Sequence, residues 1–144
     1  MTKLPPIEKV FEAWTALASH RVRLYEDHAD ISSSDGEKGY VVRFSGNQYS
    51  SDDNATYWQG YAGYPVIAVL MLQGLLPYDR QEADLWSDIN WTELNKKHRN
   101  KYAAAVAEVA ADRNIDLQKS YADAERVMEA LKTLPVEIKR KLKS

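Results

Sequence analysis

The chain has 144 residues, 44% of them apolar and 28% charged, so it is long enough to bury a core and too apolar to be disordered. Its net charge of −2 argues against a dedicated nucleic-acid-binding domain, which normally carries a clear positive excess. The lack of cysteine excludes disulfides, thiol catalysis and zinc–thiolate sites.

The sequence carries no sign of export or of a membrane segment. Its first residues lack the apolar stretch of a signal peptide, so we expect none. The longest apolar run, residues 65–72, is far shorter than the roughly 20 residues that cross a bilayer. The sequence also shows no repeat, low-complexity segment or linker. We therefore expect a cytoplasmic protein without membrane contacts, in which residues 1–144 form a single globular domain.

An N-terminal helix is the first predicted element. Pro5 and Pro6 mark its start, because proline is favoured at the first positions of a helix. Apolar residues then recur at helical spacing and form one stripe: Ile7, Val10, Phe11, Trp14, Leu17 and Ala18. The spacing predicts a helix that ends near residue 19 or 20 and buries one face.

The pattern changes to a strand-like alternation over residues 21–50. Asp35-Gly36 is a typical hairpin turn, and residues 40–44 are rich in β-forming side chains. We expect an antiparallel meander of three strands, or of four if residues 48–50 add a short edge strand. A sheet of this size needs helices on one face to be stable.

The most distinctive segment joins this sheet to a buried helix. Residues 57–64 hold four large aromatic rings and two glycines. Residues 65–76 follow, apolar on nearly every side and starting with a proline. A helix that is apolar all round is buried all round, so this run predicts the central helix of the fold.

Two N-capping signals open the C-terminal part. Asp79 and Glu82 have the spacing of a capping box, which predicts a short helix through Trp86. Asn90 and Glu93 repeat that spacing. We expect a single long helix to follow them, from residue 91 to about residue 112.

A helical hairpin completes the predicted fold. Residues 113–116 are a short connection, and Asp116 is a good N-cap for a last long helix. Pro135 ends that helix, and residues 136–144 form a basic tail, for which a last turn is one alternative. The predicted class is α+β, with an N-terminal helix, a small antiparallel meander, a buried central helix and a C-terminal helical hairpin.

The aromatic segment is the main candidate site, and three interpretations stay open. In the favoured one the rings pack over the sheet, and Gly60 and Gly63 are turn positions. In the second, the rings wall a small-molecule pocket. In the third, they stack on nucleic-acid bases. The candidate ligand-binding residues are Tyr57, Trp58, Tyr61 and Tyr64, with polar groups supplied by Asp52, Asp53, Arg23 or Arg43.

Motifs of catalysis and metal binding are missing from the sequence. The three histidines, His20, His28 and His98, have no metal-ligand spacing, and neither a P-loop nor a nucleophile elbow occurs. Asp52 and Asp53 lack the spacing of a calcium loop and are interpreted as a turning loop. We therefore expect no metal, no cofactor and no catalytic residue, while enzyme activity itself stays an open question.

Three functional hypotheses follow. The leading one is a non-catalytic cytoplasmic interaction or adaptor protein with a protein partner or a second copy as partner, because four tryptophans exceed the needs of a core this size. The alternative is a small-molecule-binding protein or enzyme with an aromatic pocket around residues 57–64. The last is nucleic-acid binding through the basic residues of 96–101 and 139–143, against which the acidic balance argues.

Overall fold

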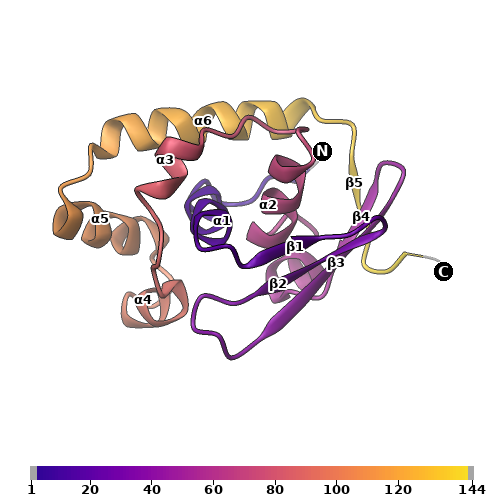
Figure 1. The fold of residues 1–144 in the computed structure, drawn as a ribbon, viewed down its shortest axis with the longest axis horizontal. Coiled ribbons are helices and arrows are strands. Elements are labelled where there is room, and N and C mark those ends of the chain that lie inside the picture. Colours follow the sequence, from indigo (N-terminus) through magenta and orange to yellow (C-terminus); the bar gives the residue numbers. More distant parts are fainter. Residues whose placement is uncertain (1–2, 143–144) are drawn as a thin grey trace.

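A mixed sheet covered on one side by helices forms the fold (Figure 1). The computed structural model describes residues 3–142. In Figure 1, α6 runs along the top of the molecule above α1 and α2, and the chain then descends to the edge of the sheet. The α+β prediction is confirmed, and the buried apolar side chains of helices and sheet form one continuous cluster.

Within the described residues the sheet has five strands in the order β1-β2-β3-β4-β5. The strands are β1 Val22–Leu24, β2 His28–Ser32, β3 Gly39–Ser45, β4 Gln48–Ser51 and β5 Glu137–Ile138. The first four pair antiparallel, which confirms the meander and its fourth strand. Ala29, Ile31 and Val42 point into the core, whereas Arg23 and Arg43 lie on the exposed outer face.

The predicted last turn in the C-terminal tail is not found, and a short strand, β5, forms there instead. Residues 137–138 pair in parallel with β4 and form no helical turn. The backbone N–H of Glu137 donates to the Asn47 carbonyl at 2.8 Å, and that of Lys139 donates to the Tyr49 carbonyl at 2.8 Å. The edge of β4 has free donors and acceptors that a nearby extended segment satisfies, and this outweighs the weak helix signal of the tail.

Two helices occupy the centre of the fold. α1, Glu8–Ala18, forms where predicted, but every side chain from Lys9 to Leu17 is buried. It contacts α2, α3, α5 and α6, so its polar side is covered as well as its apolar stripe. α2, Tyr64–Leu72, is the predicted central helix and is buried from Pro65 to Met71. It ends before the predicted residue 76, because Gly74 adopts a left-handed φ of 77°.

A single long helix over residues 91–112 is a wrong prediction. The structure has α4, Trp91–Lys97, and α5, Tyr102–Arg113, with a break between them. Arg99 and Asn100 adopt left-handed φ angles of 53° and 62°, and the Asn100 N–H closes the end of α4 on the Asn95 carbonyl at 2.7 Å. Asparagine tolerates this conformation, so local capping here outweighs helix propensity.

The remaining helices follow the predicted caps. α3, Arg80–Asp84, begins after Asp79, whose side chain accepts hydrogen bonds from the first turn. α6, Leu117–Thr133, begins after Asp116 in the same way. The α5–α6 hairpin is therefore confirmed in outline, with a left-handed Asn114 ending α5.

The first residues of the aromatic segment lie in a short π-helix, η1, Ala55–Gln59. Gly60 ends it with a left-handed φ of 76°, as expected for a turn glycine. Gly63 has an ordinary φ of −68°, so its turn role is not the predicted one. A Cβ at Gly63 would collide with the side chains of Asp53 and Thr56, which makes glycine necessary there for lack of space.

Candidate functional site

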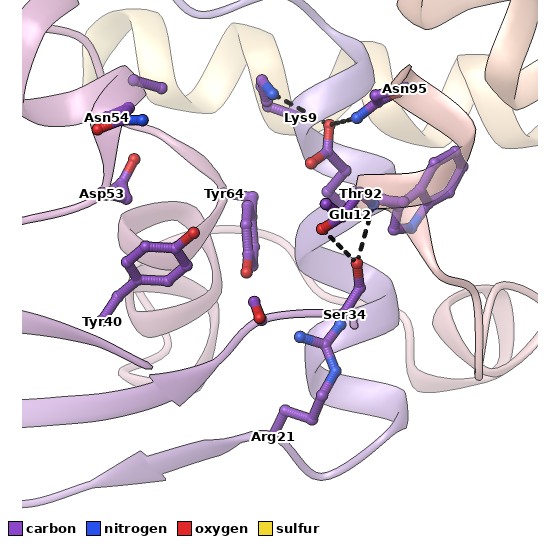
Figure 2. A pocket seen from close by; sticks show the side chains of 13 residues that line it. Lys9, Glu12, Arg21, Ser34, Tyr40, Asp53, Asn54, Tyr64, Thr92 and Asn95 are labelled. Atoms are coloured by element: carbon purple, nitrogen blue, oxygen red, sulfur yellow. Dashed lines mark hydrogen bonds and ion pairs between the residues drawn. The ribbon is translucent and has the colours of Figure 1, made fainter. Parts of the chain in front are cut away.

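A polar cavity of about 170 Å³ lies where α1, the β2–β3 region, the turn before η1, the start of α2 and α4 meet (Figure 2). Charged and phenolic side chains from five separate parts of the chain line it: Lys9, Glu12, Arg21, Tyr40, Asp53 and Tyr64. Such groups rarely gather in a domain interior unless they are paired or functional. This cavity is the best candidate site of the fold.

A buried ion pair from α1 forms one wall. Lys9 Nζ lies 3.1 Å from Glu12 Oε2, and the two side chains are only 10% and 8% exposed. Burial alone would lower the pKa of Lys9, but the charge of Glu12 and its hydrogen bond, together with Tyr102, raise it on balance. Lys9 Nζ also sits 4.3 Å from the centroid of the Tyr102 ring, and Asn95 from α4 donates to Glu12 Oε2 at 3.5 Å. Lys9 is therefore held as a cation whose charge is already engaged by Glu12 and the Tyr102 ring.

Arg21 reaches the cavity from the turn after α1. His20 adopts a left-handed φ of 57°, and the Arg21 N–H donates to the Ala16 carbonyl at 2.9 Å, which fixes where the side chain leaves the helix end. Arg21 Nη1 donates to the Ser32 carbonyl. Arg21 Nη2 is buried and has no hydrogen-bond partner among residues 3–142. A buried donor left unpaired costs about 1–3 kcal/mol, more when charged, so this group marks a place where an acceptor would be stabilising.

Two tyrosines stand between Arg21 and the far wall. The rings of Tyr40 and Tyr64 meet edge to face, with centroids 6.4 Å apart. Burial raises the pKa of Tyr64 well above its usual value, although the nearby Arg21 guanidinium opposes the rise. Burial, and then the charge of Asp53, also raises the pKa of Tyr40. Both phenols therefore keep their protons at neutral pH and can donate hydrogen bonds.

Asp53 is a buried carboxylate on the wall opposite α1. Its Oδ1 accepts from the Ser51 hydroxyl, and its Oδ2 accepts from the Thr56 N–H at 3.0 Å. The Thr56 hydroxyl in turn accepts from the Gly63 N–H at 2.9 Å. The neighbouring Asp52 instead accepts from the Val41 N–H at 2.9 Å. The interpretation of this pair as a turning loop is thus supported, and Asp53 lies beside the cavity without an ion pair in the described part of the chain.

The four predicted aromatic residues do not share one pocket. Tyr64 lines the cavity, whereas Tyr57 lines a separate cleft with Arg43 and Arg140. Trp58 is 65% exposed, so core packing is a wrong interpretation for this ring. Tyr61 is half-buried beneath Lys3, 5.7 Å away. The π-helix turns Tyr57 and Trp58 outward, and the reversal at Gly60 sends the following residues back toward α1.

Three of the most informative cavity residues are absent from the sequence-based candidates. Lys9 and Glu12 lie on consecutive turns of the first helix, and that spacing was the available signal for a polar wall. Arg21 gives no such signal, because its role depends on the turn at His20 and on the position of β2. The other arginines considered, Arg23 and Arg43, lie outside the cavity.

An exposed acidic contact links the two helices that were predicted as one. Glu108 of α5 accepts from Lys97 Nζ at 2.7 Å and lies 3.1 Å from His98 Nε2. The hydrogen bond from Lys97, and then that from His98, hold the pKa of Glu108 below its usual value. This contact fixes α4, which carries three residues of the cavity wall.

A pH-dependent contribution to stability follows from the Glu108 contact. Because the folded-state pKa is lowered, the stabilisation is present above the usual glutamate pKa of about 4.5 and disappears as the pH falls through the lower folded value. We expect the wild type to unfold at higher urea than Glu108→Gln at neutral pH, with the gap closing toward roughly pH 3. Urea midpoints across this range measure it, and a gap independent of pH would contradict the assignment.

Within the described residues there is neither a cluster of three potential metal ligands nor a helix able to span a membrane. No group of three histidine, aspartate or glutamate side chains within residues 3–142 is close enough to hold a metal ion. Every helix in that range is too short or too polar to cross a bilayer.

A known protein family matches most of the sequence. The sequence model of the family described as "Uncharacterised conserved protein UCP014422" matches residues 2–137, which is nearly the whole chain. No curated protein and no solved structure matches significantly.

Proposed function

The chain belongs to the family described as Uncharacterised conserved protein UCP014422, and from its geometry we propose that it binds a small polar molecule in the cavity beside α1. The observation that carries the proposal is the buried Lys9–Glu12 pair facing that cavity. Apolar side chains of similar volume usually stabilise a fold at least as well as a buried ion pair. Stability alone therefore gives little reason for two charges on a central helix.

The dimensions of the cavity restrict the ligand. Sites for drug-sized ligands span about 300–1,000 Å³, whereas this cavity measures about 170 Å³. Most of its lining residues carry hydrogen-bonding groups, and the rings of Tyr40, Tyr64 and Trp91 supply its large apolar surfaces. A compact, hydrophilic metabolite fits these features better than an extended apolar one. The proposal keeps the sequence-based hypothesis of a small-molecule site, with Tyr64 as its single aromatic candidate in the cavity.

Ligand-observed NMR with a panel of small polar metabolites tests the proposal. At least one compound should give saturation transfer with the wild type and lose it with Glu12→Gln, while Glu125→Gln on the exposed side of α6 keeps it. Circular dichroism must first show that Glu12→Gln is folded. If no compound binds the wild type, or if all bind both variants equally, the proposed function is wrong.

An interaction protein stays the second candidate, because the exposed Trp58 supports it. Tyr57 packs edge to face on Trp58, and the Arg140 guanidinium lies 5.3 Å from the Trp58 ring centroid, so the ring is held in place at the surface. Ordered, exposed aromatic rings are common at protein interfaces. Light scattering after size exclusion tests self-association. A mass above that of the monomer for the wild type, with a lower mass for Trp58→Ser, supports it, and a strict monomer counts against a homodimer.

A cytoplasmic location likewise stays a prediction.

A further inference from the structure

We infer that the ligand is a small amino-acid-like zwitterion, with its carboxylate at Arg21 and its cationic group at Glu12. This inference rests on the proposed function, since it names the class of molecule that the same cavity binds. The two ends of the cavity differ in charge, and each end has one group whose hydrogen-bonding capacity the protein leaves unused.

Arg21 defines the end that accepts an anion. The cavity has two cations, but Lys9 is already engaged by Glu12 and by the Tyr102 ring. Arg21 Nη2 has no partner within residues 3–142. In Figure 2 the guanidinium reaches into the space between Tyr64 and Ser34. The Arg21 side chain also hydrogen-bonds the Tyr64 phenol, whose own O–H can still donate, so a carboxylate placed beside Nη2 would receive hydrogen bonds from two side chains.

Glu12 defines the end that accepts a cation. Both of its hydrogen bonds, from Lys9 and Asn95, go to Oε2, and no residue within 3–142 donates to Oε1. Asp53 lies across the cavity, and its hydrogen bonds come from the neutral Ser51 hydroxyl and Thr56 N–H. A ligand ammonium group near Glu12 Oε1 would therefore meet one carboxylate directly and a second one opposite.

The charge balance favours a zwitterion over a phosphate or a simple acid. The ionisable side chains of the wall are two cations, Lys9 and Arg21, and two carboxylates, Glu12 and Asp53, besides the two protonated tyrosines. A phosphate would bring close to two further negative charges next to both carboxylates, with one unpaired cation to receive them. A zwitterion leaves the balance unchanged and supplies a partner of opposite charge to each end, which buried charges require.

Three matched probe sets test this assignment by isothermal titration. They are the common L-amino acids with β-alanine, the corresponding amino-acid amides, which lack the carboxylate, and the corresponding N-acetyl amino acids, which lack the ammonium group. At least one zwitterion should bind the wild type, with its amide and its N-acetyl form each weaker by about tenfold or more, as expected for a lost charged hydrogen bond.

Two variants separate the ends of the ligand. Arg21→Gln should lower the acid-to-amide affinity ratio, because only the Tyr64 phenol still donates to the carboxylate, and it should leave the free-to-acetylated ratio unchanged. Glu12→Gln should lower the free-to-acetylated affinity ratio and leave the acid-to-amide ratio unchanged. Arg43→Gln, on the outer face of the sheet, should keep both ratios. Both affinities in a ratio are measured on the same folded variant, so a general loss of stability lowers both and leaves the ratio unchanged.

The outcomes keep this inference apart from the proposed function. If amides or N-acetyl forms bind the wild type as tightly as the free amino acids, or if only other metabolites of the panel bind, the inference is wrong and the proposed function stands. If Arg21→Gln lowers the melting temperature but leaves the acid-to-amide ratio intact, Arg21 is a structural residue and the inference is again wrong. If no compound of any set or of the panel binds, both are wrong.

Discussion

Replacing Lys9 by methionine should destabilise the fold by about 3 kcal/mol or more, because it leaves the Glu12 carboxylate buried without its cation. Methionine keeps most of the volume and the unbranched shape of the lysine stem, so the lost charge dominates the effect. Among residues 3–142, Asn95 is then the one remaining hydrogen-bond partner of Glu12, at 3.5 Å. Urea denaturation at neutral pH measures the change in the free energy of unfolding.

The double variant Lys9→Met, Glu12→Leu separates stability from function. Removing both charges should restore most of the lost stability, since an apolar replacement of a buried pair is often neutral or stabilising. The same variant should bind none of the small molecules that the wild type binds. Lys97→Met is the matched control, because it breaks an exposed ion pair on α4 and should have a far smaller effect. If the Lys9 and Lys97 variants lose equal stability, the buried pair is not coupled as described.

Gly63→Ala should be the other strongly destabilising change, by about 1–3 kcal/mol for an overpacked site. The added methyl group would lie 2.8 Å from the Thr56 hydroxyl oxygen and collide with the Asp53 carboxylate. Asp53 has little freedom to yield, because both of its oxygens hold hydrogen bonds inside the fold. The clash therefore displaces a residue of the cavity wall as well as the turn before α2.

Gly39→Ala is the matched control for this prediction. At that position in β3 the nearest atom to an added Cβ is the Ile31 carbonyl oxygen at 4.0 Å, which is an ordinary contact. A glycine-to-alanine change without strain is close to neutral or slightly stabilising. Chemical denaturation of both variants makes the comparison. Equal midpoints would mean that the Asp53 side chain moves aside freely, and the steric explanation for Gly63 would fail.

Much of the fold could be predicted because its signals are local. The apolar stripe of α1, the Asp35-Gly36 turn and the caps at Asp79 and Asp116 each act within a few residues of their own position. The same reasoning failed at β5, whose two residues form a strand only because β4 offers an edge beside them. It failed again after Lys97, where a left-handed turn and the contacts to Glu108 replace the helix that propensity favours.

The site was harder to predict than the fold. The density of aromatic rings over residues 57–64 pointed to a segment that borders the cavity, but the π-helix directs those rings to different surfaces. The cavity instead combines side chains that are far apart in the sequence, from Lys9 in the first helix to Asn95 in α4. Arg21 enters the cavity because the end of α1 and β2 lie next to each other in the folded chain. Residue spacing in the sequence does not predict that arrangement.

The pairing of β5 with β4 also implies an order of assembly. The four-stranded meander needs contacts between neighbouring segments only, so it can form early. By contrast, β5 pairs Glu137 with Gln48, far away in the sequence, and therefore carries a larger loop-closure entropy. Until α6 has packed, the edge of β4 is open to other chains. Once in place, β5 is a very short strand that contains Glu137 and is followed by Lys139 and Arg140, and short strands with charged side chains discourage further strand addition. Intermediates that lack the α6–β5 unit should therefore be the aggregation-prone species of this protein.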